Sequence, residues 1–349
     1  YTAGSAAARV AEEESLELLL LAGPLPEDLG FRTWPAVAGF SFTAKCWGIV
    51  LVEGLHEINF NEHAFDRLVI PDSRKRLIEA LVLSHADDKV PVYATTSAVA
   101  DGRPDSGKSV AKTTDVMEGK GEGSIFLLHG PPGVGKTLTA EAIAELLHRP
   151  LYAVSMGELG TSPEALEERL ADLLDLCTPW GALVLIDEAE MLLERRTKGD
   201  IVRNAMVCVM LRLLEYYRGI LFLTTNRVES LDPAFQSRVT CALKYPPLDA
   251  AARQLIWSDV LKHAGIAATA PSGGAHSHAP PAGSRGGDAS GDLDLERLAA
   301  QELNGRQIKN TLQLALALSR REGVPLRMQH LNASLEITTS FIAETQEPL

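Results

Sequence analysis

The sequence contains a glycine-rich stretch, Gly130-Pro131-Pro132-Gly133-Val134-Gly135-Lys136-Thr137, that fits the phosphate-binding pattern G-x-x-x-x-G-K-[ST]. Its glycines let successive backbone N–H groups turn toward phosphate oxygens, and the helix that follows directs its positive end at the same place. Lys136 is placed to reach the β- and γ-phosphates of a nucleotide, and the Thr137 hydroxyl is placed to bind Mg²⁺. We therefore expect the residues from Gly130 to Leu138 to form a nucleotide site.

The segments on either side of this loop bear on whether the match is accidental. Residues 124–129 form an apolar run with the length of a buried strand, and residues 136–147 carry apolar side chains at helical spacing. Strand, glycine loop and helix thus follow one another in the order that the pattern requires. The alternative is an ordinary glycine turn, which would not need this order.

A pair of acidic residues closes a second apolar run. Leu183-Val-Leu-Ile leads directly into Asp187 and Glu188. Asp187 can hold Mg²⁺, directly or through a water, and Glu188 can polarise an attacking water. The alternative is a strand that leaves the core through two solvent-exposed acids, but the preceding phosphate loop favours the magnesium and water roles.

Two polar residues after the next apolar run complete the candidate site. Asn226 follows residues 220–224, and its amide can hydrogen-bond the γ-phosphate or the water. Arg238 follows shortly after Asp232-Pro233. A phosphate-loop ATPase that works as a ring needs a cation supplied across the subunit boundary, and the fork of arginine matches phosphate oxygens. The alternatives are a turn asparagine and an ordinary surface arginine.

Charge and composition count against some classes of protein. The 349 residues include 33 Lys and Arg against 46 Asp and Glu, a net charge of −13, which argues against broad electrostatic binding to nucleic acid or acidic membranes. No apolar run reaches the length of a membrane span, so we expect none. Four scattered cysteines without a C-x-x-C pair indicate free thiols in a reducing compartment. We expect an intracellular, cytoplasmic location, with a nuclear or organelle-associated location as the alternative.

The order of the expected elements indicates the fold class. Further short apolar runs at 151–155, 182–187, 220–224 and 241–245 alternate with helical patterns. This alternation predicts an α/β domain whose five-stranded parallel sheet is covered on both faces, with ligands at the carboxyl ends of the strands. After Pro246-Pro247 the pattern is helical only and predicts a small α-helical lid domain.

The N-terminal part is weakly patterned. We expect residues 1–60 to form an irregular strap and a short β-hairpin, in which Trp47–Val52 pairs with Ile58–Phe60 across a Glu53-Gly54 turn. Because the first residue is Tyr1 and not Met, we expect the chain to begin inside a longer protein.

Two larger domains are expected to follow. Residues 61–247 form the α/β nucleotide-binding domain, which includes a Gly-, Ser- and Lys-rich surface loop at 88–123. Residues 248–349 form the helical lid, which includes a low-complexity loop at 265–291.

The loop Gly130–Thr137, the Asp187-Glu188 pair, Asn226, Arg238 and the helical lid together resemble an AAA+ P-loop ATPase, over roughly residues 60–345. Four shorter stretches resemble the C-terminal ATPase module of large, uncharacterised fungal AAA proteins: Ala64–Pro71, Glu118–Gly123, Leu214–Tyr217 and Asn304–Asn310. The resemblance implies a P-loop NTPase fold, an AAA+ core followed by a lid, with ATP and Mg²⁺ as cofactors.

The resemblance also implies a role for each site residue. Lys136 and Thr137 would be the Walker A pair, and Asp187 and Glu188 the Walker B pair, with Thr137 and Asp187 at the metal. Asn226 would be the first sensor of the γ-phosphate. These roles make Lys136, Glu188 and Asn226 catalytic residues.

Three further positions follow from the resemblance. Arg238 would be an arginine finger that acts on the ATP of a neighbouring subunit. Arg306, beside Gly305, stands where many AAA+ lids carry a second sensor; it would contact the γ-phosphate from the lid, or it forms a structural salt bridge. The Leu68-Val69 region would flank adenine. One departure is that Met156–Gly160 contains no aromatic residue, whereas protein-threading relatives carry an aromatic-hydrophobic-glycine loop there, so the sequence does not predict threading.

The resulting hypothesis is an ATPase that assembles into a homo-oligomeric ring, hexamers being usual for the superfamily, and remodels an unknown protein partner. A second hypothesis is an ATP-gated assembly scaffold with little turnover, which steady-state phosphate release would distinguish. A third is a nucleic-acid-associated AAA+ motor, against which the acidic balance counts; stimulation of hydrolysis by DNA or RNA would favour it.

Overall fold

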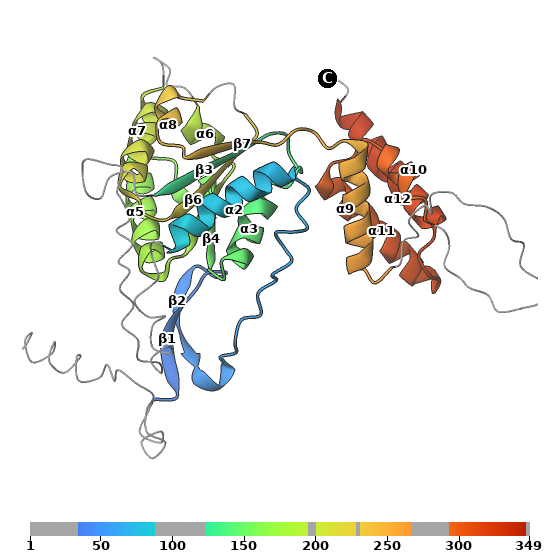
Figure 1. Ribbon diagram of the computed structural model, residues 1–349, viewed down its shortest axis with the longest axis horizontal. Helices are drawn as coiled ribbons and strands as arrows, with labels where there is room; N and C mark the ends of the chain where they lie inside the picture. The colour runs from blue at the N-terminus through green and yellow to red at the C-terminus, as the bar shows by residue number, and fades with distance from the viewer. Residues whose placement is uncertain (1–33, 88–122, 195–199, 228–230, 267–292, 347–349) are drawn as a thin grey trace, which may run out of the picture. The chain divides into compact units, whose positions relative to one another are not determined.

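The computed structural model describes residues 34–87, 123–194, 200–227, 231–266 and 293–346 (Figure 1). Two compact units divide the chain, Tyr1–Asn59 with Val90–Ala111 and Phe60–Lys89 with Lys112–Leu349. The loops predicted at 88–123 and 265–291 fall outside the described residues, apart from Gly123, Gly265 and Ile266. The predicted domain boundaries stay predictions.

The described residues of the first unit form a β-hairpin. β1 (Ala36–Ser41) pairs antiparallel with β2 (Cys46–Leu51), and a single 3-10 turn, η2 (Val52–Gly54), follows β2. The prediction that Trp47–Val52 pairs with Ile58–Phe60 is therefore wrong, because the partner strand precedes β2 and residues 58–60 form no strand.

The turn between the two strands explains the observed pairing. Lys45 has a φ of 54° and donates its N–H to the Ser41 carbonyl at 2.7 Å, and the Ala44 N–H bonds the Ser41 hydroxyl at 3.1 Å. These bonds form a turn over residues 42–45, of the kind found in hairpins with longer loops. The rings of Phe40 and Trp47 then meet edge to face across the pair, with centroids 5.5 Å apart.

The second unit contains a five-stranded parallel sheet with the order β4-β5-β6-β3-β7. Its strands are β3 (Ser124–His129), β4 (Leu151–Ser155), β5 (Leu183–Asp187), β6 (Ile220–Thr225) and β7 (Cys241–Lys244). The predicted α/β class with five parallel strands is confirmed. Every residue of β6 is buried, as expected for a strand in a parallel sheet that is covered on both faces.

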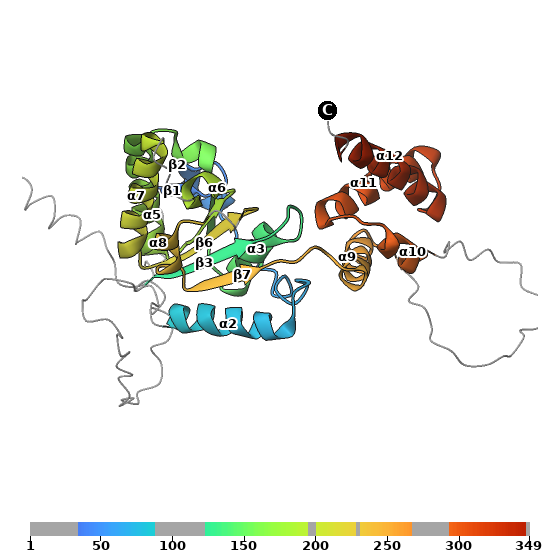
Figure 2. The same cartoon turned by 90° about the horizontal axis from the view of Figure 1, so that it is seen from above.

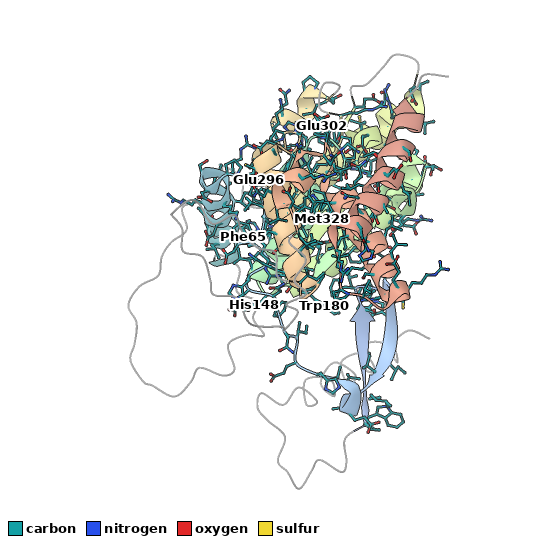
Figure 3. The ribbon with its side chains drawn as sticks, turned by 90° about the vertical axis from the view of Figure 1, so that its right-hand side faces the viewer. Phe65, His148, Trp180, Glu296, Glu302 and Met328 are labelled. Atoms are coloured by element: carbon teal, nitrogen blue, oxygen red, sulfur yellow. The ribbon has the colours of Figure 1, made fainter. Side chains whose placement is uncertain are left out.

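Helices cover both faces of this sheet (Figures 1 and 2). α2 (Asp72–Asp87) and α3 (Lys136–Leu146) share a buried cluster with Phe126 and Phe222, whose rings stack with centroids 5.1 Å apart. Phe65, labelled in Figure 3, precedes α2 and is buried in the same cluster. α5 (Pro163–Trp180) and α7 (Ile201–Tyr216) pack together on the other side of the sheet.

Side-chain caps fix where the helices begin. The Ser162 hydroxyl accepts the Ala165 N–H at 3.2 Å at the start of α5, and Asp200 accepts the Arg203 N–H at 3.0 Å at the start of α7. Three further helices have one turn each: α4 (Met156–Leu159), α6 (Glu190–Leu193) and α8 (Pro233–Gln236). None of the described helices has the length and apolarity that a membrane crossing requires.

The C-terminal part of the second unit is helical, as the lid prediction requires. Its helices are α9 (Ala250–His263), α10 (Leu295–Ala300), α11 (Gly305–Glu322) and α12 (Met328–Gln346). They enclose their own core around Trp257, Leu298, Ile308 and Leu331, each fully buried.

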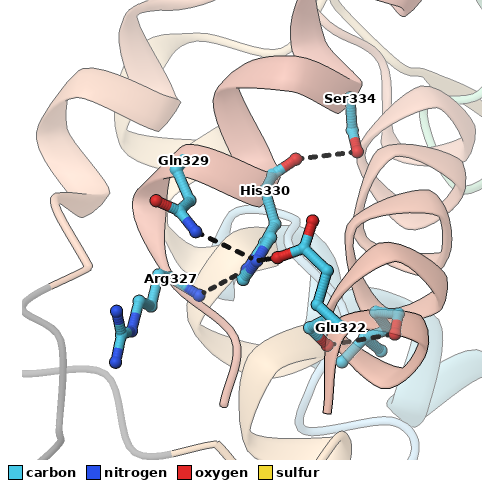
Figure 4. A network of polar contacts seen from close by, with 7 residues as sticks. Glu322, Arg327, Gln329, His330 and Ser334 are labelled. Atoms are coloured by element: carbon cyan, nitrogen blue, oxygen red, sulfur yellow. Dashed lines mark hydrogen bonds and ion pairs between the residues drawn. The ribbon is translucent and has the colours of Figure 1, made fainter. Parts of the chain in front are cut away.

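His330 connects the end of α11 to the start of α12 through hydrogen bonds (Figure 4). It is 3% exposed, and its Nδ1 accepts the Arg327 N–H at 3.0 Å. Because Nδ1 is an acceptor, the ring proton lies on Nε2, which donates to the Glu322 carboxylate at 3.0 Å. The network holds the two long lid helices in one register at this end.

Candidate active site

The predicted phosphate loop connects β3 to α3 at the carboxyl end of the sheet. Gly133 and Gly135 have φ angles of 73° and 99°, in the left-handed region that residues with a Cβ rarely adopt. Gly135 is the residue at the N-terminal cap of α3, so the first N–H groups of this helix lie at the loop. Pro132 and Leu138 are exposed at its surface. The backbone of the loop therefore fits a phosphate group.

Lys136 is the first residue of α3 and is 8% exposed. Its Nζ donates to the carbonyls of Gly130 at 2.7 Å and Pro131 at 2.8 Å, and to Oδ1 of Asn226 at 2.8 Å. An ammonium has three N–H donors, so each of them has a partner. The structure thus brings the predicted loop lysine and the predicted sensor asparagine together.

The charges around Lys136 come from both the sheet domain and the lid. Burial is the main cause that lowers the pKa of Lys136, and the Arg306 guanidinium lowers it further. The carboxylates of Glu190, Asp187 and Glu188 act in the opposite direction. A cation between a bound phosphate group and these three carboxylates would reduce their mutual repulsion, which fits a site that takes Mg²⁺ and phosphate together.

Thr137 and Asp187 supply oxygen atoms at this place. The Thr137 hydroxyl lies 3.2 Å from each oxygen of the Asp187 carboxylate. A hydroxyl and a carboxylate are hard oxygen ligands of the kind that Mg²⁺ prefers, together with water and phosphate oxygens. The donor set therefore fits the implied metal.

Glu188 follows Asp187 with an unusual backbone conformation. Its φ is 55°, in the left-handed region, and its side chain is exposed. The Glu188 N–H donates to the Thr224 hydroxyl at 2.9 Å, and the next N–H, of Ala189, donates to the Thr224 carbonyl at 2.9 Å. The turn after β5 is thus held by the end of β6.

Sequence reasoning missed two residues of this site, Thr224 and Glu190. The Thr224 hydroxyl also donates to Oδ1 of Asp187. Oε1 of Glu190 accepts the Asn226 N–H at 2.7 Å and so fixes the backbone that carries the predicted sensor. The available signals were the second Glu in Asp187-Glu188-Ala189-Glu190 and the polar Thr224 near the end of an apolar run.

Arg238 lies apart from this group of residues. Its guanidinium forms an ion pair with Glu215 of α7 at 3.0 Å and donates to the Ala234 carbonyl at 3.1 Å. No contact within the described residues joins it to the phosphate loop of its own chain. A role in the site would therefore have to be exercised on another copy.

The lid meets the phosphate loop at the start of α11. The Gly305 N–H donates to the Gly133 carbonyl at 2.8 Å, and Asn304 forms a capping box with Gln307. Arg306 is exposed in the first turn of α11, and no carboxylate among the described residues forms an ion pair with it. The guanidinium nevertheless lies near enough to influence Lys136.

A cavity of about 510 Å³ lies beside the loop. Leu68, Val69 and Val134 contribute apolar walls, and Tyr245 and Leu255 line it as well. An apolar cavity of this size next to a phosphate loop suits a flat base, and it contains the Leu68-Val69 pair that was expected to flank adenine.

Comparison with known proteins agrees with this geometry. Residues 126–246 match the family model described as "ATPase family associated with various cellular activities (AAA)". The chain is 38% identical over 94 residues to a mitochondrial Lon protease homolog of Yarrowia lipolytica, a match covering 24% of this chain and 8% of the relative. It is 36% identical over 121 residues to the mouse nuclear valosin-containing protein-like protein, covering 32% and 14% respectively.

A plant protein matches over a longer stretch. Replication factor C subunit 5 of Arabidopsis thaliana is 29% identical over 175 residues, which is 46% of this chain and 45% of the relative. The matched region thus spans less than half of each of these relatives. Fungal proteins are among the relatives, but mouse and plant proteins match too, so the narrower likeness to fungal AAA proteins is supported only in part. Residues 126–246 therefore match an ATPase domain of the AAA family, and this region contains the phosphate loop and the acidic pair described above.

Proposed function

We propose that this chain binds Mg²⁺·ATP at the Gly130–Thr137 loop and hydrolyses it. The observation that carries the proposal is a pair of hydrogen bonds from adjacent residues, in which Lys136 contacts Asn226 and Thr137 contacts Asp187. These residues come from three separate segments, and the fold brings them to one edge of the sheet. The match of residues 126–246 to an ATPase family supports the same reaction.

Each residue has a distinct task in this proposal. Lys136 and the N–H groups of the loop hold the phosphates, and Thr137 and Asp187 hold Mg²⁺, which when bound neutralises phosphate charge. Glu188 accepts a hydrogen bond from the attacking water and orients it. Asn226 donates its side-chain amide to the γ-phosphate or to that water, and Arg306 adds positive charge from the lid.

Arg238 acts on the ATP of a neighbouring copy, so the active form is a homo-oligomeric ring, with a hexamer as the expected size. Support comes from the ion pair with Glu215, which holds Arg238 away from its own loop. The hydrogen bond from Gly305 to Gly133 links the lid to the loop, so that a change at the phosphates can move the lid. We propose that this movement remodels a protein partner, in an intracellular, cytoplasmic setting that the free cysteines favour.

A nucleic-acid-associated motor is the second candidate, because one similar relative carries the name replication factor C. The net charge of −13 counts against it. An ATP-gated scaffold with little turnover is the third candidate. Its binding site would be the same, and only the rate of phosphate release would differ.

Steady-state release of phosphate from ATP tests the proposal. Release should require Mg²⁺ and should be lost in Lys136→Ala, which controls for contaminating ATPases. Stimulation by single-stranded DNA or RNA would favour the motor. Nucleotide-dependent assembly without release in the parent chain would favour the scaffold.

A further inference from the structure

Thr224 joins Asp187 and Glu188 through one hydroxyl group. It is 1% exposed and lies next to the last residue of β6. The register of the sheet pairs Ile186 with Leu223, so the following residues, Asp187 and Thr224, are neighbours. The hydroxyl donates to Oδ1 of Asp187 and accepts the Glu188 N–H at 2.9 Å.

The bond from the Glu188 N–H to the Thr224 hydroxyl stabilises an unusual backbone conformation at Glu188. Glu188 has a φ of 55°, and in the described part of the chain only Lys45 and His148 share a positive φ among residues other than glycine. Such a conformation persists only where surrounding contacts determine it. Here the contacts are both from Thr224: its hydroxyl holds the Glu188 N–H, and its carbonyl holds the Ala189 N–H at 2.9 Å.

We propose that Thr224 is a positioning residue that sets the Asp187 carboxylate and the Glu188 side chain in one fixed relation. The inference rests on the proposed function for its catalytic meaning. The donor bond orients the carboxylate that would hold Mg²⁺, and the acceptor bond holds the turn that aims the residue that would orient water.

Threonine suits this position for two physical reasons. A hydroxyl donates and accepts at once, so one atom satisfies the carboxylate and the amide together. The branched Cβ restricts χ1, so the hydroxyl has little freedom to leave its place. An alanine or a valine would leave the Glu188 N–H without its partner and remove a hydrogen bond from Asp187.

The test compares Thr224→Val, which has nearly the same shape, with Thr224→Ser, which keeps the hydroxyl. Thr311→Val is the matched control, because Thr311 is also fully buried but bonds Gln307 within α11 of the lid. The readouts are hydrogen exchange at the Glu188 amide, binding of Mn²⁺ in the presence of ADP by electron paramagnetic resonance, and phosphate release.

In Thr224→Val the hydrogen of the Glu188 amide should exchange faster than in the parent. Mn²⁺ affinity and turnover should each fall by about tenfold to a hundredfold. Thr224→Ser and Thr311→Val should resemble the parent. Parent-like exchange and Mn²⁺ binding in Thr224→Val would overturn the proposal. If the parent itself releases no phosphate, the proposed function fails, and the exchange of the Glu188 amide still decides the role of Thr224.

A second variant without the hydroxyl tests whether a folding defect causes the effects of Thr224→Val. Thr224→Ala removes the hydroxyl without placing a new methyl group where the oxygen was. Faster exchange at Glu188 in a folded Thr224→Ala variant would support the positioning role. Unfolding of both hydroxyl-free variants would overturn it in favour of a purely structural role.

Discussion

Asn226 accepts a hydrogen bond from the Lys136 ammonium at 2.8 Å, and this bond joins the end of β6 to the start of α3. The Asn226 backbone is held in turn by Glu190, whose carboxylate accepts its N–H at 2.7 Å. Three segments far apart in the sequence therefore meet at one residue, through its side chain and its backbone N–H. The position of Asn226 depends on the loop before α3 and on the turn after β5 together.

Replacing Asn226 should affect turnover more than nucleotide binding. Asn226→Ala removes an acceptor from Lys136 and a donor from the proposed reaction, but it leaves the loop backbone and the Thr137–Asp187 contact in place. We expect turnover to fall by about a hundredfold, the usual effect of losing one preorganised donor, with ADP affinity within a few-fold of the parent. Phosphate release and calorimetric titration with ADP measure the two quantities. An equal loss in both would contradict the assignment and indicate a binding role.

Replacing Glu188 should separate binding from hydrolysis. Glu188→Gln keeps the size of the side chain and the backbone bond to Thr224 but removes the basic carboxylate. Turnover should fall by about 10²- to 10⁴-fold, the range for a general base, while ATP still binds. Glu168→Gln, on the exposed surface of α5, is the matched control. Parent-like turnover in Glu188→Gln would remove Glu188 from the mechanism.

The strand, loop and helix around Gly130–Thr137 were predictable because their signals are local. A short apolar run, a glycine pattern and a helical spacing each occupy consecutive residues, and Asp187 and Glu188 stand directly after a second such run. Contacts between segments were not predictable in the same way. Thr224 lies beside Asp187 only because of the β5–β6 register, and no property of residues 220–225 alone specifies that register.

The hairpin illustrates the same limit. The segment 36–41 pairs with β2 because a turn at 42–45 brings the two together, but the nearby Glu53-Gly54 resembled a turn more closely. Arg238 is a third case. Its position after Asp232-Pro233 could be read from the sequence, whereas its ion pair with Glu215 depends on how α7 packs near α8.

Arg238 should act in trans. Arg238→Ala should lower turnover by about a thousandfold in the assembled form, as expected for a missing arginine finger, without loss of ADP binding. Mixing Arg238→Ala subunits with Lys136→Ala subunits should restore part of the activity, since an intact loop then meets an intact arginine across an interface. Arg212→Ala is the control, because Arg212 forms a comparable ion pair with Glu167 on the surface. No restoration on mixing, in assemblies shown to contain both subunits, would contradict a role in trans.

His129, the last residue of β3, should make stability depend on pH. Burial is the main cause that lowers its pKa below 6.5, and the charges of Lys244, Lys136 and Arg74 add to the effect. Between the lowered pKa and 6.5 the unfolded chain binds a proton here that the folded chain does not, so the free energy of unfolding rises with pH across that window. Below the lowered pKa both states are protonated and the penalty is complete.

Urea unfolding measured at several pH values around 6.5 checks this expectation. His129→Gln should flatten the rise, whereas His56→Gln, at an exposed position, should leave it unchanged. An identical slope in His129→Gln and the parent would show that other groups cause the dependence.

Gly133 should be intolerant of any side chain, because both its backbone and its surroundings exclude a Cβ. Its φ is 73°, and a Cβ built there would lie 2.6 Å from Oδ1 and Cγ of Asn304, the residue that caps α11. Gly133→Ala should lower the free energy of unfolding by about 1–2 kcal/mol through the backbone alone. It should also weaken ADP binding, because the loop and the start of the lid helix must move apart.

Two variants separate these causes. Gly157→Ala is the control, since a Cβ there meets no atom within 4 Å and its φ is not positive. Adding Asn304→Gly to Gly133→Ala relieves the clash but not the backbone strain, so ADP affinity should recover in part while stability does not. Unchanged ADP affinity in Gly133→Ala would mean that the contact between the lid and the loop has no part in nucleotide binding, and the proposed coupling of the phosphates to the lid through Gly305 would then fail.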